Sequence, residues 1–180
     1  MPDNIIEPAV SDELVELVEL VELIEVVDAD DVVVGVVDRA RVRAERLRHR
    51  TAFVVVRSTH GEILAHRRAE TKSSAPGQWD LGFGGAVGVG ESYAAAAARE
   101  LAEEAGITTP LHLVSDYHYD GADSVEIGRL YETVSDGPFV HPASEVAEAR
   151  FVEPTGLDHF VATHRLCRAA VDVMVDFLRP

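Results

Sequence analysis

The chain has 180 residues, 47% of them hydrophobic, which is the length and composition of one domain with a sizeable core. Its formal net charge of −16 argues against binding to a nucleic-acid polymer or an anionic membrane through the overall field of the protein. No apolar run approaches the roughly 20 residues that span a bilayer, and the first residues, MPDNIIEPAVSDE, are acidic where a signal peptide is basic. We therefore expect a cytoplasmic protein that acts on a small molecule.

Residues 1–21 form an acidic, low-complexity N-terminal extension. Residues 13–27 repeat a three-residue unit, ELV ELV ELV ELI EVV, whose period matches neither a helix nor a strand. We expect an acidic, solvated helix that leads into a strand, and we assign this extension no chemistry. We place the boundary of the single domain at residue 22, so that it comprises 22–180.

Strand and helix signals then alternate along the chain. Asp28 to Asp31 lie between two β-branched runs, which indicates a hairpin, and RARVRAERLR has helix-forming composition. Strands are expected in TAFVVVRS and EILAHRR, with Gly61 in the turn between them. Further strands are expected in LHLVSDYHY, SVEIGRLYETV and EARFVEP, followed by a last helix from about His159 to Leu178. This order predicts an α/β sandwich around a mixed sheet.

The single cysteine, Cys167, has no partner for an internal disulfide. Its surroundings, HRLCRAAVDVM, have the spacing of an apolar helix face, so we expect a buried, inert thiol.

Six of the sixteen basic residues lie in DRARVRAERLRHR, residues 38–50. Such a run is either a solvated helix face or, if an anion site lies nearby, a surface that binds phosphate.

Residues 73–91, SSAPGQWDLGFGGAVGVGE, are rich in glycine and hold the only tryptophan. Glycine at this density predicts a loop that turns sharply or lets the backbone approach a ligand closely. A helix is expected to begin near Glu91 or Ser92 and to end at a C-terminal cap, Gly106.

Three carboxylates of this helix share one stripe at about 100° per residue, namely Glu100, Glu103 and Glu104. Like charges at this spacing repel, so the cluster is either a solvated face or a cation site. Carboxylates with no histidine or thiolate nearby offer hard oxygen ligands, which suit Mg²⁺ or Mn²⁺. Arg99 lies beside Glu103, where it can orient that side chain. A separate apolar stripe is expected to pack on the sheet: Ala94, Ala98, Leu101 and Ala105.

The spacing around the carboxylates resembles the Nudix box, G-x5-E-x7-R-E-U-x-E-E-x-G-U with U aliphatic. Gly85, Glu91 and residues 99–107 match it at every fixed position. The resemblance extends to PGQW before the box and to the order of strands, loop and helices through most of the chain. It implies the Nudix fold, an α/β/α sandwich with a mixed sheet, and a pyrophosphohydrolase that cleaves a diphosphate linked to another group X.

The resemblance also implies roles for individual residues. It assigns Glu100, Glu103, Glu104 and a backbone carbonyl of the Gly84-Gly85 pair to Mg²⁺ or Mn²⁺, and Arg99 and Glu91 to the support of the loop. Another acid from a later loop completes the site in several Nudix enzymes. Glu145 is our candidate for this acid, with Glu148 as its competitor. The candidate catalytic carboxylates are therefore Glu103, Glu104 and Glu145.

The flanking stretches LRHRTAF, HRRAETK and PGQWDLGFGG resemble the branch related to isopentenyl diphosphate isomerase. That enzyme carries a catalytic cysteine and a metal-binding histidine where this chain has Gly84 and Ala86, and further metal histidines at the places of Arg43 and Arg50. These departures favour a hydrolase, with Arg43 and Arg50 as candidates for binding substrate phosphate through their planar guanidinium groups.

Two alternatives remain: an isomerase-like enzyme, and a Nudix-fold protein that binds its ligand without cleaving it. The group X and the oligomeric state stay open, with a homodimer among the possibilities.

Overall fold

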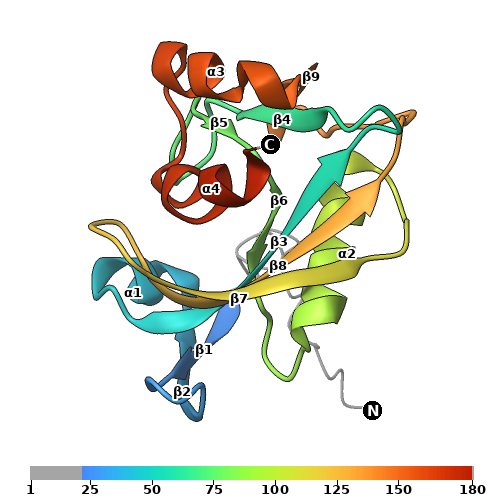
Figure 1. Cartoon of the computed structure of the whole chain (residues 1–180). Coiled ribbons are helices and arrows are strands. Elements are labelled where there is room, and N and C mark those ends of the chain that lie inside the picture. Colours follow the sequence, from blue (N-terminus) through green and yellow to red (C-terminus); the bar gives the residue numbers. More distant parts are fainter. Residues whose placement is uncertain (1–21, 180) are drawn as a thin grey trace, which may run out of the picture.

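The computed structural model describes residues 22–179, so the predicted N-terminal extension lies outside the described residues. Within that part of the chain, no helix combines the length and apolar character needed to cross a bilayer. Figure 1 shows the arrangement of the elements. The strands are β1 (Leu23–Val27), β2 (Val33–Asp38), β3 (Arg48–Arg57), β4 (Ile63–Arg68), β5 (Trp79–Asp80), β6 (Phe83–Ala86), β7 (His112–Asp120), β8 (Val125–Val134) and β9 (Val146–Val152). The helical segments are α1 (Arg39–Ala44), α2 (Tyr93–Ala105), η2 (Pro154–Gly156), α3 (Leu157–Thr163), η3 (Ala170–Met174) and α4 (Val175–Leu178).

Strand β3 organises the sheet. It pairs in parallel with β8 along its whole length and antiparallel with β6, while β7 is antiparallel to β8. Strand β4 pairs antiparallel with β5 and β9 but meets β3 only at Arg57 and Ile63, so these three strands splay away from β3. The hairpin predicted around residues 28–31 is present as β1 and β2. The sheet is therefore mixed, as predicted.

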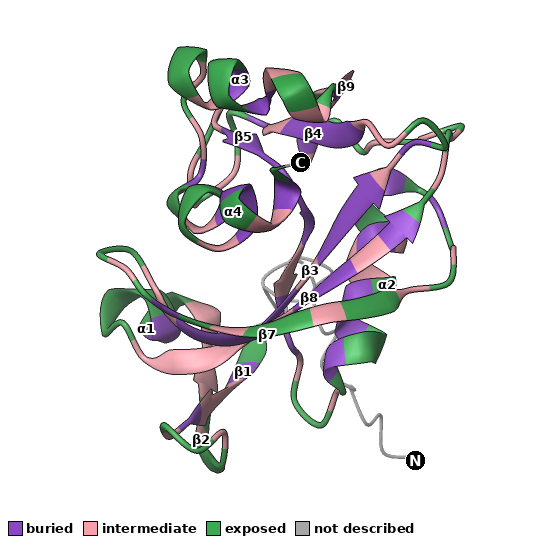
Figure 2. Ribbon diagram, in the orientation of Figure 1, coloured by how far each residue is buried: buried purple, intermediate pink, exposed green. Residues whose placement is uncertain are grey.

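Helices cover both faces of β3 and β8 (Figure 1). Because side chains alternate along a strand, Val54 of β3 faces α2 and packs in one core with Leu101, whereas Val55 faces the C-terminal segments and packs with Leu157 and Met174. Figure 2 shows β3 and β4 as largely buried, while β1 and β2 are more exposed. The predicted α/β/α sandwich is confirmed.

Helix α2 begins and ends close to where the sequence predicts. The Oγ of Ser92 accepts a hydrogen bond from the N–H of Ala95 at 3.2 Å, which caps the first turn. Gly106 ends the helix with φ 70°, a left-handed conformation in which a residue with a Cβ is strained.

The apolar stripe of α2 was predicted only in part. Leu101 and Ala105 are buried, but Ala94 and Ala98 are exposed, and Glu104 is buried instead. The helix is therefore turned so that part of its acidic stripe faces inward.

The predicted last helix from His159 to Leu178 is wrong, because the chain leaves helical geometry between α3 and η3. There Leu166 forms a bridge to Trp79 of β5, in which the N–H of Trp79 donates to Arg165 and the N–H of Cys167 donates to Trp79, both at 2.8 Å. These bonds to a strand replace those of a continuous helix. Cys167 is buried as predicted, and its burial raises the pKa of the thiol, but it does not lie on a helix face.

The arginine run is only partly helical. Helix α1 ends at Ala44, and Arg46 adopts φ 49°, which turns the chain into β3. Arg48 and Arg50 consequently lie on a strand, where successive side chains point to opposite faces.

Candidate active site

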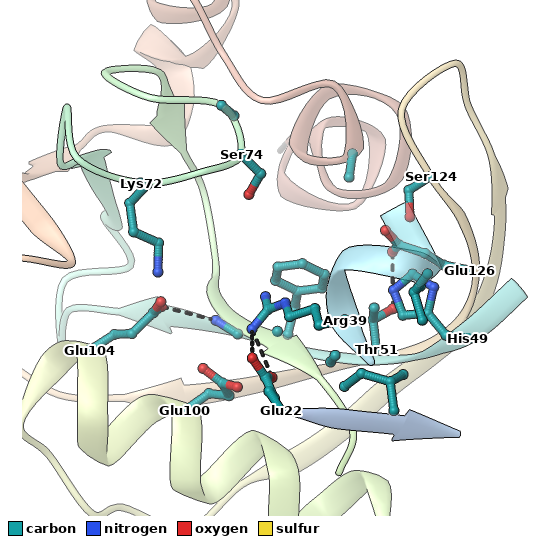
Figure 3. A pocket seen from close by; sticks show the side chains of 18 of the residues that line it. Glu22, Arg39, His49, Thr51, Lys72, Ser74, Glu100, Glu104, Ser124 and Glu126 are labelled. Atoms are coloured by element: carbon teal, nitrogen blue, oxygen red, sulfur yellow. Dashed lines mark hydrogen bonds and ion pairs between the residues drawn. The ribbon is translucent and has the colours of Figure 1, made fainter. Parts of the chain in front are cut away.

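A cavity of about 1150 Å³ opens beside β6. Figure 3 shows Glu100 and Glu104, which project from α2, at one end, which we call the acidic end. His49, Ser124 and Glu126 lie at the other end, which we call the distal end. The two ends belong to one continuous space, so a single ligand can occupy both.

The acidic end is built by α2 and the glycine loop. Glu104 is only 5% exposed, and its Oε2 accepts a hydrogen bond from the N–H of Gly84 at 3.3 Å. A Cβ on Gly85 would lie 2.8 Å from Oε1 of Glu100, so a side chain at this position would displace that carboxylate. Burial, together with neighbouring Glu100, raises the pKa of Glu104 to about 8. Burial also raises the pKa of Glu100, although Arg99 opposes this effect.

Glu103 is the most exposed of the three carboxylates, although it shares Nη1 of Arg99 with Glu100. Its side chain is 57% exposed, and it approaches the Nη1 of Arg99 at 3.3 Å. Within residues 22–179, no three histidine, cysteine, aspartate or glutamate side chains converge on one point at ion-binding distance. The structure therefore brings together Glu100, Glu104 and the Gly84-Gly85 backbone, and leaves Glu103 at the mouth of the cavity.

Arg99 and Glu91 tie the loop to the helix. The Nε and Nη2 of Arg99 donate to the two carboxylate oxygens of Glu91 at 3.0 Å each, and Nη1 donates to Glu100 at 2.8 Å. Arg99 also donates to the carbonyl of Ala86 at 3.3 Å, and Glu91 accepts from the N–H of Gly88 at 2.9 Å. The hydrogen bond from Arg99 lowers the pKa of Glu91 and keeps it ionised. These hydrogen bonds link the loop that carries Glu91 to helix α2.

A hard divalent cation fits the acidic end. The available side-chain donors are carboxylate oxygens of the buried Glu104 and the half-buried Glu100, and the glycine backbone approaches them closely. These are the conditions under which Mg²⁺ or Mn²⁺ is preferred over Zn²⁺.

The cavity also carries cations, although the chain is strongly acidic. The Nη1 of Arg43 donates to the Oγ of Ser73 at 2.6 Å, and among the described residues no carboxylate pairs with Arg43. Burial lowers the pKa of Arg43, as do the positive charges of Arg39 and Arg68. A site that holds guanidinium groups together in this way favours an anion. The sequence drew attention to the arginine run but not to the other cations of the cavity, which come from separate segments: Arg68, Lys72 and Arg168.

Arg50 is a correction to the sequence analysis. Its Nε donates to Asp31 at 2.6 Å and its Nη1 donates to Glu25 at 2.9 Å, and its guanidinium lies 5.9 Å from the ring centroid of Tyr93. It is not among the residues that line the cavity. Arg50 lies one residue before Thr51, which does line the cavity, and one step along a strand reverses the face.

Glu145 and Glu148 are distinguished by their surroundings. Glu145 lines the cavity and forms an ion pair with Lys72. Glu148 lies on β9 outside the cavity lining, where Arg67 approaches it at 3.6 Å. Of the two candidates, only Glu145 is placed to meet a ligand in the cavity.

Buried polar groups at the distal end were missed by the sequence analysis. Thr51, Asp80 and Glu126 are each at most 8% exposed, yet all three line the cavity. The available signal was a polar residue inside an otherwise apolar strand pattern, as in RTAFVVV and SVEIGRLY.

Together the fold and this site define a pyrophosphohydrolase. The NUDIX domain family matches residues 47–170, and the chain therefore belongs to the Nudix family. It is 39% identical over 125 residues to an uncharacterised Nudix hydrolase of Pseudomonas aeruginosa, covering 69% of this chain and 74% of that protein. It is 35% identical over 126 residues to the uncharacterised Nudix hydrolase YfcD of Escherichia coli, covering 69% of this chain and 70% of that protein.

Solved structures share the fold at low sequence identity. A Deinococcus radiodurans protein aligns with a TM-score of 0.72 at 23% identity, covering 87% of this chain and 97% of that chain. The NUDIX domain of Shewanella oneidensis NrtR, complexed with ADP ribose, aligns with a TM-score of 0.58 at 15% identity, covering 78% of this chain and 96% of that chain.

Proposed function

We propose that the protein hydrolyses the diphosphate linkage of a nucleoside diphosphate-X type substrate with Mg²⁺ or Mn²⁺. The observation that carries the proposal is that the buried Glu104 and the half-buried Glu100 lie together against the glycine loop, in a cavity that also holds guanidinium groups such as that of Arg43. The negative charge of a diphosphate must be neutralised for cleavage. The guanidinium groups supply positive charge directly, and the carboxylates supply it through a metal ion that they would bind. The NrtR domain, which was solved with ADP ribose, shows that a protein of this fold binds a ligand of this class.

The residues of the acidic end divide the work of binding. Glu100, Glu104 and a carbonyl of the Gly84-Gly85 pair would hold the metal, which when bound neutralises diphosphate charge and lowers the pKa of a coordinated water. Arg99 and Glu91 hold the loop against α2, and so fix the distance between the carbonyl and the carboxylates. Glu103 stays a predicted ligand or proton acceptor at the mouth of the cavity.

Glu145 and Arg43 serve the substrate in this proposal. Glu145, which forms an ion pair with Lys72, is the candidate that accepts the proton of the attacking water. Arg43 offers two parallel N–H groups to phosphate oxygens, a geometry that lysine does not provide.

The resemblance to the isomerase branch does not extend to isomerase chemistry. At the position of the isomerase cysteine, a Cβ on Gly84 would lie 2.1 Å from the carbonyl oxygen of Ala52, so this backbone leaves no room for a side chain. The glycine loop therefore offers no thiol at that position for proton transfer at an allylic carbon. The complete Nudix box likewise favours catalysis over ligand binding alone.

A panel of diphosphates tests the proposal. The purified chain would be incubated with nucleoside triphosphates, nucleotide sugars, dinucleoside polyphosphates and coenzyme diphosphates, each with Mg²⁺, Mn²⁺ or EDTA, and the products would be separated by chromatography. We expect cleavage between phosphorus atoms only when metal is present. Cleavage that continues unchanged in EDTA, or that persists in Glu104→Gln, would contradict the proposal.

A further inference from the structure

The distal end of the cavity is a preformed polar pocket within the sheet. The Oγ1 of Thr51 donates to Oε2 of Glu126 at 3.0 Å. The hydroxyl of Tyr117 lies 2.7 Å from the same Oγ1 and donates to the same Oε2 at 3.4 Å. Glu126 is only 8% exposed, and Figure 3 shows its bond to Thr51 on the wall of the cavity near Ser124. Ion pairing to Glu126 is absent among the described residues, so hydroxyl groups alone hold this buried carboxylate.

The pairing of β7 and β8 builds this pocket. Tyr117 lies opposite Gly128, and a Cβ on Gly128 would lie 2.1 Å from Cζ of the Tyr117 ring. Glycine at that position lets the ring lie flat on β8 and brings its hydroxyl to Glu126. Thr51 pairs with Gly128 from the other side, on β3. Three strands thus fix one carboxylate from both sides.

Glu126 keeps unused hydrogen-bonding capacity toward the cavity. Both contacts involve Oε2, and no group in the described part of the chain bonds Oε1. An ionised carboxylate accepts about four hydrogen bonds, and a buried one is expected to be well satisfied. Asp80, also buried, lines the same space. A ligand at the distal end therefore meets an acceptor, Oε1 of Glu126, that no group in the described part of the chain uses.

We propose that the distal end binds the organic group X of the substrate and selects an X rich in hydroxyl groups, such as a sugar, with Glu126 as the specificity-determining residue. The inference rests on the proposed function, since it takes the diphosphate to lie at the acidic end. A sugar hydroxyl donates to Oε1 of Glu126 and accepts from a neighbour such as Ser124. A hydrocarbon X would bury Glu126 without a partner for Oε1 and is therefore rejected. A cationic X would form an ion pair with Glu126, but it would have no acceptor for a hydrogen bond from a hydroxyl group such as that of Ser124.

The test compares kcat/KM for ADP-ribose and UDP-glucose with that for isopentenyl diphosphate and inorganic diphosphate, which carry no sugar. We expect the wild-type chain to prefer the sugar compounds. Glu126→Gln, and more strongly Glu126→Leu, should lower kcat/KM for the sugar compounds about 10-fold or more, because a hydrogen bond to a charged group is lost. The sugar-free compounds should change little. Glu132→Gln, on the same strand but outside the cavity lining, is the matched control and should leave this ratio unchanged.

The outcomes separate this inference from the proposed function. Turnover of no compound in the panel would overturn the proposed function and this inference with it. Turnover with equal losses on all compounds in Glu126→Leu, or a preference for sugar-free compounds, would overturn only the inference. A merely structural role of Glu126 would give equal losses, and a shifted Mg²⁺ concentration for half-maximal rate would place Glu126 in the metal site instead.

Discussion

Arg99 contacts both carboxylate oxygens of Glu91 at 3.0 Å while a third nitrogen of the same guanidinium contacts Glu100 at 2.8 Å. One side chain thus connects the start of α2, its acidic face and the loop before it. Lysine has a single nitrogen and cannot make these contacts together. We expect Arg99→Lys and Glu91→Gln each to lower kcat/KM roughly 10- to 100-fold, the range for residues that orient ligand groups. Steady-state kinetics at saturating Mg²⁺ would measure this. Arg41→Lys, at an exposed arginine paired with Glu45, is the control, and a similar loss there would contradict the interpretation.

Glu100→Gln and Glu104→Gln should each lower turnover on the order of 10²- to 10⁴-fold, since charge stabilisation and water activation are lost together. Glu103→Gln should lower turnover less, because that side chain is mostly exposed. Single-turnover rates with the best diphosphate of the panel would rank the three variants. If Glu103→Gln lost the most turnover of the three variants, the metal site would lie at the mouth of the cavity instead.

Without metal, Glu104 should make the stability of the folded chain depend on pH. Its pKa in the folded chain is raised to about 8 from the ordinary 4.5, so between these values the folded state holds a proton that the unfolded state lacks. Stability in EDTA therefore falls as pH rises from about 4.5 to about 8. Glu104→Gln should flatten this decline and raise the melting temperature at pH 8, whereas Glu103→Gln should not. Differential scanning fluorimetry would decide, and a lower melting temperature in Glu104→Gln would contradict the expectation.

His66 should give the opposite pH dependence. Burial lowers its pKa from 6.5 to about 3, the ring stacks on Phe83 at 4.4 Å, and its Nδ1 has no hydrogen-bond partner in the described part of the chain. The unfolded state binds the proton first, so stability is fully present above pH 6.5 and is lost as the pH falls toward 3. The slope is at most about 1.4 kcal/mol per pH unit. His66→Phe should remove this contribution from urea unfolding curves measured at several pH values, and His118→Gln, at an exposed histidine, should retain it.

Arg43→Ala should raise KM for a diphosphate substrate about 10-fold or more while leaving the Mg²⁺ requirement unchanged, because it removes a charged partner of phosphate. Arg41→Ala should do neither. Arg50→Ala should instead lower the melting temperature with little effect on KM, since Arg50 links β3 to Glu25 and Asp31. Equal, small effects of all three substitutions on KM would show that the arginine run is only a solvated surface and does not bind phosphate.

The local parts of the fold could be predicted from the sequence. Helix α2 and its caps follow from residue spacing within the helix itself, although the face that it turns inward does not. The hairpin of β1 and β2 and the mixed sheet were predictable for the same reason. The break after α3 was not, because the bond that ends the helix is made to Trp79, far away in the sequence.

The site was predictable only where one segment builds it. The face to which Arg50 points depends on how β3 pairs with its neighbours, and the resemblance to the isomerase branch indicates the position of Arg50 but not that face. The pocket around Glu126 joins β3, β7 and β8, so no single stretch of sequence contains its pattern. The cavity cations Arg68 and Lys72 belong to the segment around the end of β4, and only the folded chain brings them opposite α2.

The bridge between Leu166 and Trp79 has a consequence for how such proteins diversify. It holds the segment that follows, including Cys167 and Ala169, as a wall of the cavity beside Asp80. This wall and the carboxylates proposed to bind metal lie in different segments of the sequence. Under the proposed function, substitutions in this C-terminal segment would change which compound the cavity accepts and leave the carboxylates of α2 unchanged.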